Sequence, residues 1–155
     1  AWDFDYGEKY TDKTEEEILA ALDHGFISGL SLLGGEPFDP KNQPCVASLL
    51  KKVKERYPQK DVWCYTGYTF DKDLVKGGAA YTEYTDGMVS RIDVLVDGKF
   101  VEELKDVKLR FRGSSNQRII DVKRSLEEGR VRLWLDGGIG GSYYTDEDLA
   151  KGKKV

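Results

Sequence analysis

The sequence predicts an α/β fold built around a mostly parallel sheet. Helical and strand-like patterns alternate through the first two thirds of the chain, and the strand-like runs end at glycines or turn residues. One apolar run leads straight into the tetrad Gly34-Gly35-Glu36-Pro37. Such alternation places the strands in parallel, joined by right-handed helical crossovers. A length of 155 residues fits one domain with a hydrophobic core of its own.

The first helix is expected to begin at Thr14, where a hydroxyl at the N-cap and the carboxylate of Glu17 form a capping box. It is expected to stop at Gly25 and to be followed by a strand over residues 26–33. Residues 2–10 are aromatic and turn-like, so they predict the end of a loop, and no strand is expected before the first helix.

A second amphipathic helix is expected to start at Asp39 or Asn42 and to end at Tyr57-Pro58, because its apolar residues recur at helical spacing. The next predicted elements are a strand over residues 61–68, a short helix over 70–76, a loop over 77–87 and a strand over 92–96. The last third is less regular. It predicts strands over residues 109–113, 118–122 and 131–135, a helix over 123–128 stopped by Gly129, and a loose tail over 136–155.

The amino-acid composition limits the classes of protein to which this chain can belong. A content of 39% hydrophobic and 34% charged residues is typical of a soluble globular domain. The net charge of −4 argues against a nucleic-acid partner, and no apolar run approaches the roughly 20 residues that span a bilayer. No signal peptide is visible, and two thiols fit a reducing compartment. We therefore expect a cytoplasmic protein with neither a nucleic-acid nor a membrane partner.

Metal-binding side chains are few. Cys45, Cys64 and His24 are the only cysteines and histidine, and their spacing matches neither a zinc nor an iron–sulfur site. We expect both thiols to be free and structural, and no metal ligand in this chain.

The tetrad is the strongest candidate for a binding site. Its glycines let the backbone approach a ligand closely, and Glu36 supplies an acceptor suited to an ammonium group. A strand that ends there places both at the carboxyl edge of the sheet, where open α/β folds hold ligands. A simple turn after a strand would explain the same residues, so that alternative stays open.

Several runs resemble the activating proteins of anaerobic ribonucleoside-triphosphate reductase, a family of small radical S-adenosylmethionine (SAM) enzymes. They are AWDF at 1–4, LLGGEP at 32–37, DVWCYTGYT at 61–69, IDVLVDG at 92–98 and LRFRGSSNQRIIDV at 109–122. The resemblance implies that residues 1–155 form one radical SAM domain, a partial (β/α) barrel. In this family a CxxxCxxC loop ahead of the Trp-Asp-Phe segment holds a [4Fe–4S] cluster. The motif is absent here, so we expect the first strand and cluster loop to be missing and this chain alone to be inactive.

The resemblance also implies two groups of site residues. SAM is expected to contact Gly34, Gly35, Glu36, Pro37, Thr66 and Asp97. Thr66 could instead only end a strand, and Asp97-Gly98 could be a tight turn. The reductase is expected to contact Arg110, Arg112, Asn116, Gln117 and Arg118, which could alternatively shape the sheet edge or form structural ion pairs.

The implied reaction is reductive cleavage of SAM followed by formation of a glycyl radical on the reductase, with electrons from a flavodoxin-like donor. Two alternatives remain: a SAM-binding or interaction module without a cluster, and a radical SAM enzyme with another substrate. An unrelated nucleotide-binding α/β protein is disfavoured, because GxxxxGKS and GxGxxG are both absent.

Overall fold

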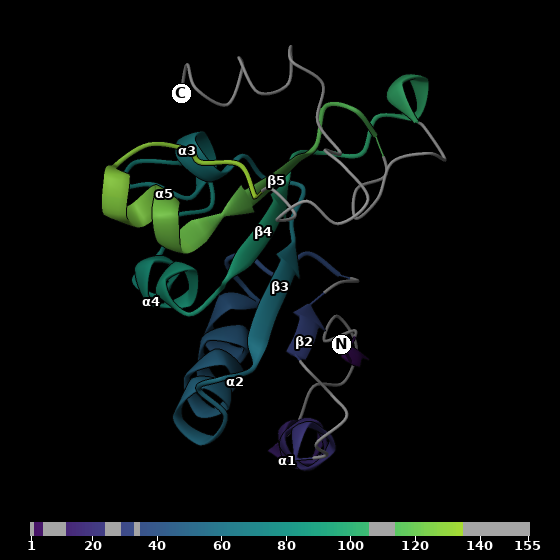
Figure 1. The fold of residues 1–155 in the computed structure, drawn as a ribbon, viewed down its shortest axis with the longest axis vertical. Coiled ribbons are helices and arrows are strands. Elements are labelled where there is room, and N and C mark those ends of the chain that lie inside the picture. The colour runs from purple at the N-terminus through teal and green to yellow at the C-terminus, as the bar shows by residue number, and fades with distance from the viewer. Residues whose placement is uncertain (1, 5–11, 24–28, 33–34, 106–113, 135–155) are drawn as a thin grey trace.

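The computed structural model describes residues 2–4, 12–23, 29–32, 35–105 and 114–134 (Figure 1). The elements in chain order are β1 (Trp2–Phe4), α1 (Asp12–Leu22), β2 (Gly29–Leu32), α2 (Gln43–Arg56), β3 (Asp61–Tyr65), α3 (Phe70–Asp73), α4 (Thr85–Ser90), β4 (Val94–Asp97), the 3-10 turn η1 (Glu102–Leu104), β5 (Arg118–Asp121) and α5 (Val122–Glu128). Within the described residues, no helix has the length and apolar character to cross a membrane.

The strands form one open sheet in the order β1-β2-β3-β4-β5. The first four are parallel, and β5 runs antiparallel to β4. Leu30 is in register with Val62, and Cys64 is in register with Leu95. The prediction of an α/β fold with a mostly parallel sheet is confirmed, whereas the radical SAM type of barrel stays a prediction.

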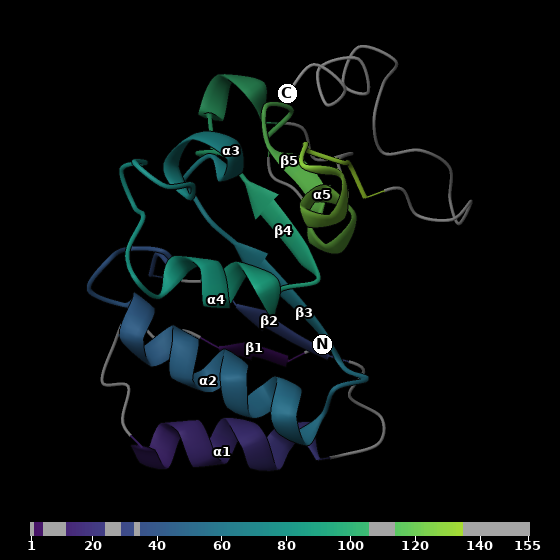
Figure 2. The ribbon, with the colours of Figure 1, turned by 90° about the vertical axis from the view of Figure 1, so that its left-hand side faces the viewer.

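The helices gather on one side of the sheet. In Figure 2, α2 and α4 lie in front of the strands, α1 lies next to α2, and α5 lies beside β5. The apolar face of α2 and the buried apolar residues of β2 to β5 form one core. The fully or almost fully buried members include Val46, Leu50, Leu30, Cys64 and Leu95.

The structure corrects several sequence predictions near the amino terminus. Residues 2–4 were expected to lie in a loop, yet they form β1 and pair with β2, Trp2 opposite Leu30. Three residues are too few for a strand pattern to be recognised, and the neighbouring strand supplies the hydrogen-bonding partners. Helix α1 begins at Asp12, so Thr14 lies inside the helix and the capping-box prediction is wrong.

Later elements also differ from expectation. Helix α4 lies partly within the predicted loop 77–87, and the glycine in its sequence TDGMVS hides the helical pattern. The predicted strand at 131–135 is reduced to an isolated bridge between Leu133 and Ile120 in the described part. The helix at 123–128 is confirmed as α5, and Gly129 ends it with a φ of 68°. The predictions for residues 109–113 and 136–155 lie outside the described residues.

Candidate functional site

Three segments meet where β2, β3 and β4 end. We call them the rim: residues 35–38 after β2, residues 66–70 after β3, and residues 97–98 at the end of β4. Because the three strands are parallel, their carboxyl ends lie at one edge of the sheet. The fold therefore places Glu36, Thr66 and Asp97 at the same edge of the sheet.

Glu36 connects the first two rim segments. Its Oε2 accepts hydrogen bonds from the Phe38 amide at 2.9 Å and from the Thr66 hydroxyl at 2.7 Å. Its Oε1 accepts one from the Gly67 amide at 2.6 Å. The main-chain carbonyl of Glu36 accepts a further hydrogen bond from the side-chain amide of Asn42 at 2.8 Å. A negative charge is thus held between the ends of β2 and β3.

Thr66 orients that carboxylate. Thr66 is 5% exposed. Its hydroxyl donates to Glu36 and accepts from the Tyr68 amide at 3.1 Å. The Thr66 amide donates to the carbonyl of Val96 at 3.0 Å, which fastens the residue to the β4 side. A hydroxyl has one proton to donate, and here Glu36 receives it. These contacts make Thr66 a support for Glu36.

Gln43 holds the rim from the helical side, and sequence reasoning missed it. Its buried side-chain amide donates to the carbonyls of Phe38 at 2.8 Å and Ala80 at 2.7 Å. Its Oε1 accepts from the hydroxyls of Thr82 at 2.6 Å and Thr85 at 2.7 Å. The available signal was a polar residue three positions before Val46, in line with the apolar face of α2.

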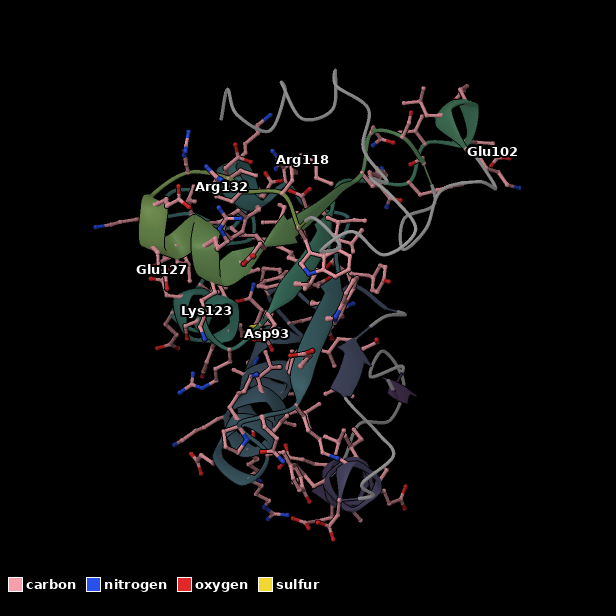
Figure 3. All side chains as sticks on the ribbon, in the orientation of Figure 1. Asp93, Glu102, Arg118, Lys123, Glu127 and Arg132 are labelled. Atoms are coloured by element: carbon pink, nitrogen blue, oxygen red, sulfur yellow. The ribbon has the colours of Figure 1, made fainter. Side chains whose placement is uncertain are left out.

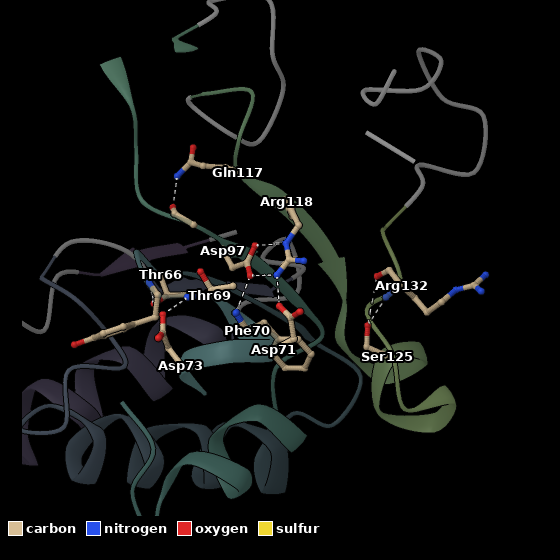
Figure 4. A network of polar contacts seen from close by, with 12 residues as sticks. Thr66, Thr69, Phe70, Asp71, Asp73, Asp97, Gln117, Arg118, Ser125 and Arg132 are labelled. Atoms are coloured by element: carbon tan, nitrogen blue, oxygen red, sulfur yellow. Dashed lines mark hydrogen bonds and ion pairs between the residues drawn. The ribbon is translucent and has the colours of Figure 1, made fainter. Parts of the chain in front are cut away.

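Asp97 is held in a buried ion pair (Figure 4). Arg118 donates from Nε to Oδ1 at 3.0 Å and from Nη2 to Oδ2 at 2.6 Å. The Phe70 amide also donates to Oδ2, at 2.8 Å. Arg118 Nη2 reaches Asp71 Oδ1 at 2.6 Å as well. Asp97 is 1% exposed, and both of its oxygens have donors. Its contacts therefore connect β4 with β5 and α3.

The charges around Arg118 also change its protonation equilibrium. Burial by itself would lower the pKa of Arg118, but hydrogen bonds and charge from Asp97 and Asp71 raise that pKa above its ordinary value. The guanidinium therefore stays charged, as this cluster requires. This arrangement favours the structural ion-pair alternative for Arg118.

Asn116 and Gln117 hold the chain that follows β4. Gln117 donates from its side-chain amide to the carbonyl of Gly98 at 3.0 Å, and Asn116 donates to that of Lys99 at 2.8 Å. Gly98 has a φ of 97°, a conformation that favours glycine. Of the remaining predicted site residues, Gly35 and Pro37 lie on the rim, Pro37 buried. Gly34, Arg110 and Arg112 lie outside the described residues.

The cysteines do not fit an iron–sulfur cluster. Cys45 is exposed on α2, whereas Cys64 is buried on β3, and both are free. Burial, and then the charge of Glu36, raise the pKa of the Cys64 thiol well above its ordinary value. The described residues contain no group of three His, Cys, Asp or Glu side chains placed to hold a metal ion. Such a cluster needs three or four thiolates, and the sequence has two cysteines.

A family model described as a 4Fe-4S single cluster domain matches residues 1–120. No solved structure matches the chain.

Curated relatives share one description. The anaerobic ribonucleoside-triphosphate reductase-activating protein of Vibrio cholerae serotype O1 is 41% identical over 118 residues, which cover 75% of this chain and 71% of that protein. The protein of that name from Escherichia coli K12 is 40% identical over the same shares. The protein of the same name from Enterobacteria phage T4 is 37% identical over 120 residues, which cover 76% of this chain and 69% of that protein. This chain belongs to the family of anaerobic ribonucleoside-triphosphate reductase-activating proteins.

Proposed function

We propose that this protein activates an anaerobic ribonucleoside-triphosphate reductase by cleaving SAM at the rim and forming a glycyl radical on the reductase. The family membership supports the target, because the relatives are named for activating that reductase. The geometry of Glu36 supports the binding site. Activation of this kind is an enzymatic activity, which we place in the cytoplasm.

One observation carries the proposal: the Glu36 carboxylate is oriented but has accepting capacity left. Two carboxylate oxygens offer about four acceptor positions, and Phe38, Thr66 and Gly67 occupy three of them. Two donors lie on Oε2 and one on Oε1, so Oε1 can accept one more. Glu36 is also half-buried, which strengthens a charge-assisted hydrogen bond to an ammonium group.

The remaining rim residues take supporting roles in this proposal. Gly35 brings the backbone close to the amino group of SAM, and Pro37 limits the conformations of the turn. Contact of Gly34 with SAM stays a prediction. Thr66 orients the Glu36 carboxylate. Asp97 holds the rim segment 66–70 through the Phe70 amide, and Arg118 neutralises its charge. Direct contact of Thr66 or Asp97 with SAM stays a prediction.

The proposed reaction balances as two one-electron steps. One electron, supplied ultimately by a flavodoxin-like donor, enters the sulfonium group, and a carbon–sulfur bond breaks to give methionine and a 5′-deoxyadenosyl radical. That radical takes a hydrogen atom from a backbone glycine of the reductase, leaving 5′-deoxyadenosine and a glycyl radical. The residues of this chain bind and orient SAM, and none of them is assigned to the electron transfer.

A second candidate function follows from the cysteine count. Two cysteines fit a SAM-binding or interaction module that performs no reductive cleavage on its own. The two functions differ in one measurable product, because only the activating enzyme converts SAM to methionine and 5′-deoxyadenosine.

Replacement of Glu36 tests the proposal. In the protein purified anaerobically, we expect Glu36→Gln to weaken SAM binding by roughly ten- to a hundred-fold, about 1.5–3 kcal/mol. The lost interaction is the charge-assisted hydrogen bond to the ammonium group. Equilibrium dialysis measures the affinity, and Glu127→Gln, an exposed carboxylate on α5, is the matched control. Unchanged affinity in a folded Glu36→Gln protein would show that the tetrad is only a turn.

A further inference from the structure

We propose that the reductase docks on the arm, residues 98–105, which follow β4 and include the 3-10 turn η1. The inference rests on the proposed function for the identity of the partner. It assigns the contact to Phe100 and Leu104, and it gives Asn116 and Gln117 the role of holding the arm in place.

The arm exposes apolar side chains. Phe100 is 48% exposed and Leu104 is 42% exposed, although both are large and apolar. They are two of the five large hydrophobic residues that are exposed in the described structure, and they lie within five positions of one another. Figure 3 shows Glu102, between them in sequence, at the outer end of the arm, away from both the sheet and the helices. Exposed aromatic residues of this kind are typical anchors of protein interfaces.

Hydrogen bonds hold the base of the arm. The Gly98 amide donates to the carbonyl of Tyr68 at 3.0 Å. The carbonyls of Gly98 and Lys99 accept from the side chains of Gln117 and Asn116, as described above. Further along, the Val101 amide donates to the hydroxyl of Ser114 at 3.2 Å. An exposed apolar segment held in this way loses little conformational entropy when it binds, which favours a docking role.

The position of the arm identifies its partner. The arm follows β4 directly, so it leaves the sheet at the edge that carries Glu36 and Thr66. The hydrogen bond from Gly98 to Tyr68 joins its base to the rim segment after β3. A protein that presents a backbone glycine to a ligand on the rim must cover this edge, and the arm stands beside it. The reductase, as the proposed target of the reaction, meets that requirement.

The charges of the arm fit the border of an interface. Lys99, Glu102, Glu103 and Lys105 are all exposed and flank the two apolar side chains. An apolar centre with a polar border of both signs is the usual arrangement in complexes that also exist as separate proteins. Asn116 and Gln117 then act in docking by positioning the arm and not by contacting the reductase, since their side-chain amides donate to carbonyls of the arm.

A pair of matched double variants tests the inference. The arm variant is Phe100→Ser with Leu104→Ser. The control is Val75→Ser with Leu126→Ser, residues that are 41% and 52% exposed beside a groove of about 240 Å³ between α3 and α5. We expect the arm variant to bind the anaerobic reductase at least about tenfold more weakly, and the control to bind within about twofold. Biolayer interferometry under anaerobic conditions measures both affinities.

Two further measurements distinguish reductase binding by the arm from SAM binding by the rim. SAM affinity should be unchanged in the arm variant, because neither serine substitution touches the rim contacts. Asn116→Ala should weaken reductase binding to an intermediate extent, since it removes the donor to the carbonyl of Lys99. Reductase binding by the arm variant that equals that of the unaltered protein, or an equal loss in the control, would overturn the inference. Failure of the unaltered protein to bind SAM would instead overturn the proposed function.

Discussion

Arg118 shows how a single side chain at the sheet edge can be mistaken for a partner-binding group. Its guanidinium forms a two-pronged contact with Asp97 and a further contact with Asp71. The side chain of Asp97 is 1% exposed, whereas that of Arg118 is 19% exposed. Removing Arg118 would leave a carboxylate buried without its cation, which is far more costly than losing a surface ion pair.

We expect Arg118→Met to lower the free energy of unfolding by about 3–5 kcal/mol, measured by urea denaturation. Arg124→Met is the matched control, because the Arg124 side chain is 49% exposed and pairs with Glu128 at 3.8 Å. The control should lose no more than about 0.5 kcal/mol. Adding Asp97→Asn to Arg118→Met should restore part of the loss, since the two residues are in direct contact. A stable Arg118→Met protein that no longer activates the reductase would assign Arg118 to docking after all.

At the scale of elements, the position of the rim depends on the hydrogen bonds between the start of α2 and residues 80–85, which lead into α4. Helix α2 begins at Gln43, and the buried side chain of Gln43 binds the carbonyls of Phe38 and Ala80 together with the hydroxyls of Thr82 and Thr85. The amide therefore connects the segment that carries Glu36 to the start of α4. Its two N–H donors and the two lone pairs of its oxygen each have one partner.

Replacement of Gln43 by leucine should destabilise the protein by at least about 3 kcal/mol, because two carbonyls and two hydroxyls each lose a buried or part-buried hydrogen bond. Thermal unfolding followed by circular dichroism measures the effect. Gln59→Leu, at an exposed position before β3, serves as the control and should change the free energy of unfolding by less than about 0.5 kcal/mol. An equal, small effect at both positions would show that the hydrogen bonds of Gln43 do not stabilise the fold.

At the scale of the whole molecule, the helices cover one face of an open sheet, and the rim and the arm lie along the carboxyl ends of the strands (Figures 1 and 2). The family model describes a 4Fe-4S domain, yet the two cysteines are divided between the surface of α2 and the interior of β3. The 155 residues therefore contain too few thiolates to hold such a cluster.

Anaerobic treatment of the 155-residue chain with iron and sulfide should not yield a stable [4Fe–4S] cluster, since two thiols cannot replace three or four thiolates. Iron and sulfide content and the charge-transfer absorption measure the outcome. Cys45→Ser is the control and should give the same low iron content as the unaltered chain. A full cluster that disappears in Cys45→Ser would show that Cys45 is a ligand.

Much of the fold could be predicted from local pattern. The helical spacing of Val46, Leu49, Leu50 and Val53 predicted α2, and the glycine at 129 predicted the end of α5. The elements that escaped prediction are those whose patterns are short or interrupted: β1 has three residues, and α4 contains Gly87. For the site, the positions of Glu36, Thr66 and Asp97 on one edge followed from the ends of predicted strands, but their contacts did not.

The sequence by itself determined the order of the major elements, the parallel character of the sheet and the family, because periodicity, turn residues and motifs are properties of neighbouring residues. Only the tertiary structure decided which polar groups pair. Arg118 meets Asp97 from 21 positions away, and Thr85 meets Gln43 from 42 positions away. Such pairs depend on strand register and helix packing, which are set by burial of the whole core. For that reason two residues that looked like separate binding groups, Asp97 and Arg118, are one buried ion pair.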